Sequence, residues 1–170
     1  MDHRSLSPKV VIPVGLGDVA GLHIAFTTDF DGCFALDAEV DRNTRDAAQA
    51  LRDAGAIVNE VPIGITMEQL HHATGYHFAS IFGAWIANMI EEHRSEMTDH
   101  AIAFCDQVNQ IKGDASGWTQ IEVEAAIWTA VAPVFETHDA LLCPTLGTRG
   151  LIAGDDYYGH GLEVGGQALD

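Results

Sequence analysis

The sequence predicts an α/β domain in which a parallel β-α-β unit precedes several long helices. Two apolar stretches, 21–28 and 56–61, have the length and composition of strands. Between them lies a segment, 38–54, whose apolar residues recur every three or four positions, as in an amphipathic helix. The connections are short, so we expect the two strands to be parallel, with a right-handed crossover between them.

The first elements have clear boundary signals. In the strand over 21–28, apolar residues alternate with smaller or polar ones. Asp37 is suited to the position before the first helix, since Asp is a preferred N-cap residue. Gly55 is suited to the position after it, because glycine readily adopts the left-handed conformation that ends many helices. Pro62 is expected to end the second strand.

Three further helices are expected. Each is preceded or opened by a threonine that can cap a helix, and two of these threonines have Gln or Glu three residues later, which forms a capping box. The ranges are about 67–94 after Thr66, 98–112 with Thr98 as its cap, and 119–136 opened by Thr119 and Glu122. Pro133 is expected to kink or shorten the last helix. Trp85, Trp118 and Trp128 fall on these helices and are expected to pack in the core.

A third strand is expected over 139–145, where the residues are apolar on both faces, as in a covered sheet. Beyond Gly150 the chain is rich in glycine and shows no periodicity, so no further regular element is expected. The resulting division is an extended arm at 1–20, an α/β unit at 21–150 and a Gly-rich acidic tail at 151–170.

Composition excludes several classes of function. The chain of 170 residues has 25 acidic and 8 basic side chains and a net charge of −17, which argues against nucleic acid and anionic membranes as partners. Its cysteines, Cys33, Cys105 and Cys143, are far apart and form no C-x-x-C motif, so a cytoplasmic location is expected. The beginning of the chain has no features of a secretory signal, and the apolar stretch at 78–90 is too short to span a bilayer.

Two short patterns could carry chemistry, but each lacks a required part. Gly15, Gly17 and Ala20 spell the G-x-G-x-x-A of a dinucleotide-binding turn, yet a strand is predicted to follow where that turn needs a helix. Cys33 could act as a nucleophile with His23 as its base, but no third group is indicated to orient that base. We therefore expect no nucleotide cofactor.

A cluster of histidines offers the best candidate for a metal site. Glu68 and His71 have the E-x-x-H spacing of half a di-iron site, and His72 and His77 follow closely on the same predicted helix. The second E-x-x-H is missing, and no H-E-x-x-H motif occurs. We therefore expect these histidines to lie on a solvated or interfacial face, and we expect no metal.

Three segments, in their order and spacing, resemble the amidase signature family. The first is 19–40, which contains Gly-Leu-His-Ile-Ala and, further on, Leu-Asp-Ala-Glu-Val. The second is 47–61, with Ala-Leu-Arg-Asp-Ala-Gly-Ala-Ile-Val-Asn-Glu-Val, and the third is 135–147, with His-Asp-Ala-Leu-Leu-Cys-Pro-Thr. The family's usual forms are G-L-r-I-a with v-d-p-e-V, then a-L-e with G-a-x-V-x-E-V, and then y-D-x-L-l-x-P-T. The opening His-Arg-Ser-Leu-Ser-Pro extends the resemblance from 19–147 to about residue 3.

The resemblance implies an amidase-signature-like fold with part of a mixed sheet, and an activity that hydrolyses or transfers amide nitrogen. In the family, a lysine acts through a bridging serine on a nucleophilic serine within a G-G-S-S-G-like region. That region has no counterpart in this sequence, so no catalytic residue is assigned and the chain is expected to be inactive alone. It could be a gene fragment, a split subunit or an excised piece. The alternative is a non-catalytic binding module that docks on a partner.

The resemblance also implies a small amide as the substrate of the intact enzyme. Pro144 and Thr145 are the expected walls of its pocket, because they follow the third strand and sites in α/β folds lie at the carboxyl ends of strands. The stretch 78–90 is apolar on most sides and is expected to leave an exposed apolar face. We therefore expect either a homo-oligomer or a partner that carries the catalytic region.

Overall fold

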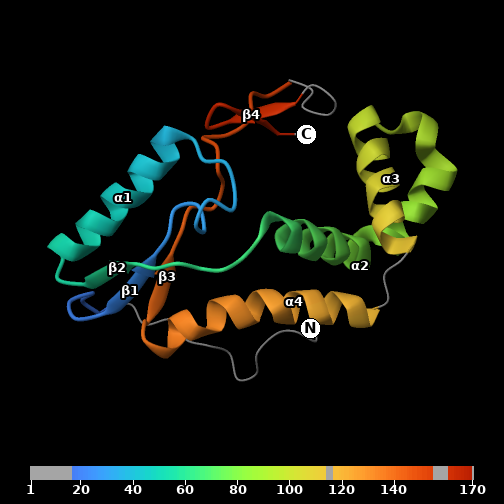
Figure 1. Cartoon of the computed structure of the whole chain (residues 1–170). Helices are drawn as coiled ribbons and strands as arrows, with labels where there is room; N and C mark the ends of the chain where they lie inside the picture. Colours follow the sequence, from blue (N-terminus) through green and yellow to red (C-terminus); the bar gives the residue numbers. More distant parts are fainter. Residues whose placement is uncertain (1–16, 114–116, 155–160, 170) are drawn as a thin grey trace.

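A computed structural model describes residues 17–113, 117–154 and 161–169, and a small parallel sheet lies at its centre (Figure 1). The sheet has the strand order β2-β1-β3, and both outer strands are parallel to β1. The strands are β1 (His23–Phe26), β2 (Ile57–Glu60) and β3 (Ala140–Leu142). The helix α1 (Ala38–Asp53) connects β1 to β2, so the predicted β-α-β unit is confirmed, with strands shorter than expected.

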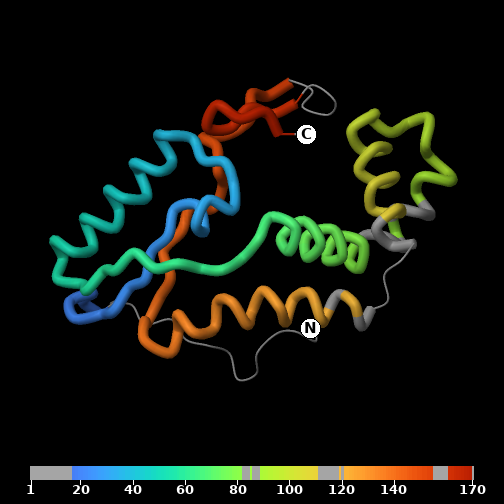
Figure 2. Tube along the Cα trace, in the orientation of Figure 1, coloured from blue at the N-terminus to red at the C-terminus, as the bar shows by residue number. Residues whose placement is uncertain are grey.

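The remaining helices form a second group that extends away from the sheet. They are α2 (Met67–His93), α3 (Asp99–Gly113) and α4 (Gly117–Val131), with 3₁₀ turns η1 (Arg94–Glu96) and η2 (Ala132–Glu136). Figure 2 shows α2 and α4 running side by side, and α3 folds back against the far end of α2. None of the helices in the described ranges is long and apolar enough to cross a membrane.

Alternation along β1 places apolar side chains on both faces of the sheet. Ile24 and Phe26 join a buried cluster with Ala48 of α1 on one face. On the other face, Ala25 packs with Val134 of η2 and with the connection between β2 and α2. The central strand is therefore covered on both sides, as parallel sheets require.

Most helix boundaries lie where the sequence predicted them. Gly55 follows α1 with a φ of +92°, and its N–H bonds to the carbonyl of Arg52 at 2.9 Å. Thr66 and Gln69 form both hydrogen bonds of the capping box, at 2.9 and 3.2 Å. Thr98 accepts a hydrogen bond from the N–H of Ala101 at 3.2 Å.

The expected start of the last helix is wrong, and its α-helical part ends at Val131, before the expected residue 136. The helix α4 begins at Gly117, so Thr119 lies inside its first turn instead of before it. The T-x-x-E spacing also places two side chains on one face within a helix, and it therefore does not define a helix start by itself. Pro133 lies in η2, directly after α4 ends at Val131, as expected of a residue that disrupts the helical hydrogen bonds.

Two expectations about packing and the end of the chain are also wrong. Trp85 and Trp128 are 62% and 61% exposed, so they do not pack in the core, while the side chain of Trp118 lies outside the described residues. A hairpin follows Gly150, with β4 (Leu162–Val164) antiparallel to β5 (Gln167–Leu169). Its two turn residues, Gly165 and Gly166, have φ values of +59° and +78°, which a two-residue hairpin turn requires.

Candidate functional site

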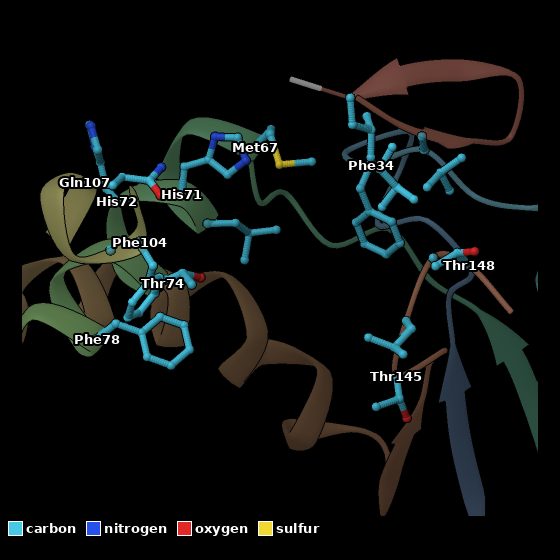
Figure 3. A pocket seen from close by; sticks show the side chains of 18 of the residues that line it. Phe34, Met67, His71, His72, Thr74, Phe78, Phe104, Gln107, Thr145 and Thr148 are labelled. Carbon is cyan, nitrogen blue, oxygen red and sulfur yellow. The ribbon is translucent and has the colours of Figure 1, made fainter. Parts of the chain in front are cut away.

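A cavity of about 780 Å³ lies beside the carboxyl edge of the sheet (Figure 3). Parallel strands end at the same edge, so the segments that follow them come together there. All three segments contribute: Phe34 and Ala35 follow β1, the first turns of α2 follow β2, and the run 144–148 follows β3. The topology of the sheet thus gathers three distant parts of the sequence around one cavity.

The walls of the cavity are mainly apolar. On one side, Phe78 of α2 and Phe104 of α3 meet edge to face, with ring centroids 5.8 Å apart. Phe34 lies on the opposite side, as Figure 3 shows. The hairpin adds Leu162, Val164 and Leu169 to the wall. A cavity with aromatic and aliphatic walls favours an apolar group in its ligand.

The charge of the cavity differs from that of the chain. The chain has a net charge of −17, but the described residues that line the cavity include no Asp, Glu, Lys or Arg. Its polar side chains are His71, His72, Thr74, Gln107, Thr145 and Thr148. Threonine hydroxyls and a glutamine amide can donate and accept hydrogen bonds without a net charge. This lining therefore suits a neutral ligand with an amide or carbonyl group.

A tight turn after β1 carries Phe34 to the cavity. Phe30 and Asp31 have φ values of +53° and +62°, in the left-handed region that is rare for residues other than glycine. The Asp31 carboxylate accepts a hydrogen bond from the N–H of Ile63 at 2.9 Å, and Thr27 Oγ1 accepts one from Phe30 at 3.2 Å. These bonds hold a strained backbone, which is a feature that concentrates at binding sites.

Pro144 and Thr145, the pocket residues expected from the sequence, both line the cavity. Pro144 is half-buried and Thr145 is exposed at the end of β3. The sequence did not predict Phe34 or the hairpin as parts of this site. The Gly-Gly pair between Leu162 and Leu169 was the available signal for the hairpin.

The candidate nucleophile and the nucleotide turn do not form sites in the described structure. Burial and the neighbouring Asp29 raise the pKa of Cys33, which disfavours the reactive thiolate. His23 lies at the start of β1, whereas Cys33 lies in the turn that follows the end of this strand. Burial likewise raises the pKa of Cys143. Gly15 lies outside the described residues, and β1 follows the G-x-G-x-x-A pattern where a helix would be needed.

The histidine cluster does not come together as a metal site. Within the described ranges, no group of three or more His, Cys, Asp or Glu side chains is arranged to hold a metal ion. His71 and His72 line the cavity, whereas His77 faces Glu124 of α4, with Nδ1 and Oε1 3.6 Å apart. The spacing along α2 thus directs these side chains to different surroundings.

Comparisons with known proteins agree with the resemblance seen in the sequence. The family model named Amidase matches residues 7–162. The fold is similar to the crystal structure of a bacterial aryl acylamidase belonging to the amidase signature enzymes family, with a TM-score of 0.66 and 23% sequence identity. The match covers 90% of this chain and 33% of that enzyme, so the chain spans about a third of that enzyme's length. Among curated proteins, no match to the chain is found.

Proposed function

Because the chain belongs to the amidase family, we propose that it forms the substrate-binding part of an amide-bond hydrolase. The observation that carries this proposal is the cavity at the carboxyl edge of the sheet, with Pro144 and Thr145 in its wall. Substrate sites of open α/β folds lie at this edge. In this proposal the two residues contact a small amide substrate, and the reacting serine and lysine come from the part of the amidase fold that has no counterpart in this sequence.

The substrate proposed for this cavity is a neutral amide with an apolar acyl or aryl group. Three phenylalanines, Phe34, Phe78 and Phe104, offer aromatic surface, and the described lining includes no Asp, Glu, Lys or Arg. The enzyme of similar fold is an aryl acylamidase, which favours an aryl amide. A cytoplasmic location is part of this proposal and is supported by the three free cysteines.

Binding of acetanilide, a small neutral aryl amide, tests this proposal. We expect the chain to bind it with a Kd of about 1 mM, as is typical of a small ligand in an open site. Phe34→Ala is expected to weaken binding about five- to tenfold, because it removes an aromatic wall worth roughly 1 kcal/mol. Ligand-observed NMR titration measures both constants.

Phe135→Ala is the matched control, because Phe135 is exposed and lies outside the cavity. It should leave the Kd for acetanilide unchanged. Benzoate, an anion of similar size, should bind more weakly than acetanilide, because the chain is acidic and the described residues that line the cavity include no lysine or arginine. If Phe34→Ala and Phe135→Ala weakened acetanilide binding equally, the cavity would not be the binding site.

A docking role is favoured by exposed apolar side chains on the helices beside the sheet. They are Ile81 and Trp85 of α2, and Ile121 and Trp128 of α4. Large apolar side chains that gather on an exposed surface can mark an interaction site. We propose that this set packs against the catalytic part of the amidase fold, since the chain spans only 33% of the similar enzyme. In the absence of that part, the same surface makes the pure chain self-associate.

Sedimentation measures this self-association. The pure chain should form dimers or larger species at about 100 μM, since large apolar side chains left exposed to water favour association. Trp85→Arg combined with Trp128→Arg should shift it toward monomer. Leu151→Arg is the control, because Leu151 is 58% exposed outside the set, and it should leave association unchanged. A monomeric wild-type chain at that concentration would overturn the proposed surface.

A further inference from the structure

The β4–β5 hairpin forms one wall of the cavity but has little internal support. Each of its strands has three residues. A two-stranded hairpin of this size is marginally stable in water by itself. Its Val164 is buried, while Leu162 and Leu169 remain partly or largely exposed. Contacts with the rest of the chain must therefore hold the hairpin in place.

The Asp37 carboxylate provides such a contact. Its Oδ1 accepts a hydrogen bond from the N–H of Gly165 at 2.9 Å, and its Oδ2 accepts one from the N–H of Arg149 at 3.4 Å. The N–H of Asp37 in turn bonds to the carbonyl of Gly147 at 2.8 Å. One residue thus joins the loop after β1, the run after β3 and the turn of the hairpin. Bonds from Gly165 and from the Thr148 hydroxyl lower the pKa of Asp37.

The hydrogen bonds of the Asp37 side chain differ from those of most aspartates at a helix N-cap. It is the N-cap of α1, where an aspartate commonly accepts hydrogen bonds from the first turn of its own helix. Its side chain makes no such bond to α1. The carboxylate instead bonds to Gly165, which is 128 residues away in the sequence.

Close backbone packing at the same place supports this contact. A Cβ added to Gly165 would lie 2.5 Å from the carbonyl oxygen of Leu36, and one added to Gly147 would lie 2.6 Å from that of Ala35. Only glycine allows the turn of the hairpin and the run after β3 to approach the loop so closely. By contrast, a Cβ added to Gly166 would meet nothing within 4 Å.

We propose that Asp37 is a positioning residue that holds the β4–β5 hairpin in place as a wall of the substrate cavity. The part of this proposal that concerns substrate rests on the proposed function. Asp37 contacts no substrate itself. It acts through Gly165, which places Val164 and Leu162 against the cavity.

Hydrogen exchange at the hairpin amides tests the proposal directly. Asp37→Ala is expected to speed exchange of the Gly165 N–H about tenfold or more, because a hydrogen bond to a carboxylate is lost. Asp37→Asn keeps one side-chain oxygen that can accept this bond and should restore most of the protection. The helix content of α1 should stay unchanged in both variants, since the side chain does not cap it. Unchanged exchange at Gly165 in Asp37→Ala would overturn the proposal.

Two glycine variants test the position of the same hairpin without altering Asp37. Gly165→Ala should displace the hairpin, because its Cβ would meet the Leu36 carbonyl. Since the cavity then loses one of its walls, acetanilide binding should weaken about threefold or more. Gly166 also has a positive φ, but a Cβ added there would meet nothing within 4 Å. Gly166→Ala should therefore leave the hairpin closer to its place than Gly165→Ala does. Release of the hairpin without any loss of affinity would contradict its role as a wall. If the wild-type chain fails to bind acetanilide, the proposed function is overturned, and the exchange rates still decide the role of Asp37.

Discussion

The chain alone is expected to hydrolyse acetanilide no faster than buffer does. Enzymes accelerate such reactions by roughly a millionfold or more, and amide hydrolysis depends on an activated nucleophile and stabilisation of the oxyanion. The sequence contains no G-G-S-S-G-like region. Ser80, one of the serines in the described structure, donates its hydroxyl hydrogen bond to the carbonyl of Tyr76 at 2.9 Å. This bond lies within α2, one turn apart, and is typical of a serine inside a helix. Binding without these groups leaves the barrier to hydrolysis almost unchanged.

Release of aniline, followed by absorbance or chromatography, measures this rate. Ser80→Ala and Ser95→Ala should give the same background rate as the wild-type chain. The turnover of acetanilide could instead scale with the concentration of pure chain and stop after treatment with a serine-directed reagent. That result would contradict the assignment of the reaction to the G-G-S-S-G-like region, which this sequence does not contain.

Phe26→Ala is expected to lower the free energy of unfolding by about 3–5 kcal/mol, the usual cost of removing a buried phenylalanine. Phe26 is 3% exposed and belongs to the buried cluster between β1 and α1. The guanidinium groups of Arg45 and Arg52 also lie over its ring, 5.9 and 5.4 Å from the centroid. The substitution therefore removes both core packing and two cation–π contacts.

Urea denaturation at a fixed protein concentration measures this loss. Phe135→Ala removes the same side chain from an exposed site on η2, where it stacks on Trp128 at 6.3 Å. It should cost less than about 1 kcal/mol. Similar losses for the two variants would show that the cluster beneath α1 does not dominate stability.

The part of the fold that the sequence predicts well is determined by local patterns. The β-α-β unit follows from alternation in β1, from the periodicity of α1 and from Gly55, all of which act over a few residues. Pro144 and Thr145 could be placed at a strand end by the same reasoning, and they line the cavity.

The features that the sequence did not predict depend on contacts between distant segments. Trp85 and Trp128 lie on apolar helical faces, but helical periodicity does not say which face another element covers. Phe34 follows a left-handed turn, and the hydrogen bond between Asp31 and Ile63 ties this turn to a segment 32 residues away. The turn of the β4–β5 hairpin bonds to Asp37, which is far away in the sequence. The short strands themselves carry too little periodicity to be told from a glycine-rich loop.

The measurement that tests the central proposal most directly is a map of amide chemical shifts during titration of the chain with acetanilide. We expect the largest shifts at Phe34, at 144–148 and in the β4–β5 hairpin, because these segments surround the cavity. Smaller shifts are expected along α1, which packs on the sheet away from the cavity lining. No shifts at millimolar acetanilide, or shifts confined to Trp85 and Trp128, would contradict the assignment of this cavity as the substrate site.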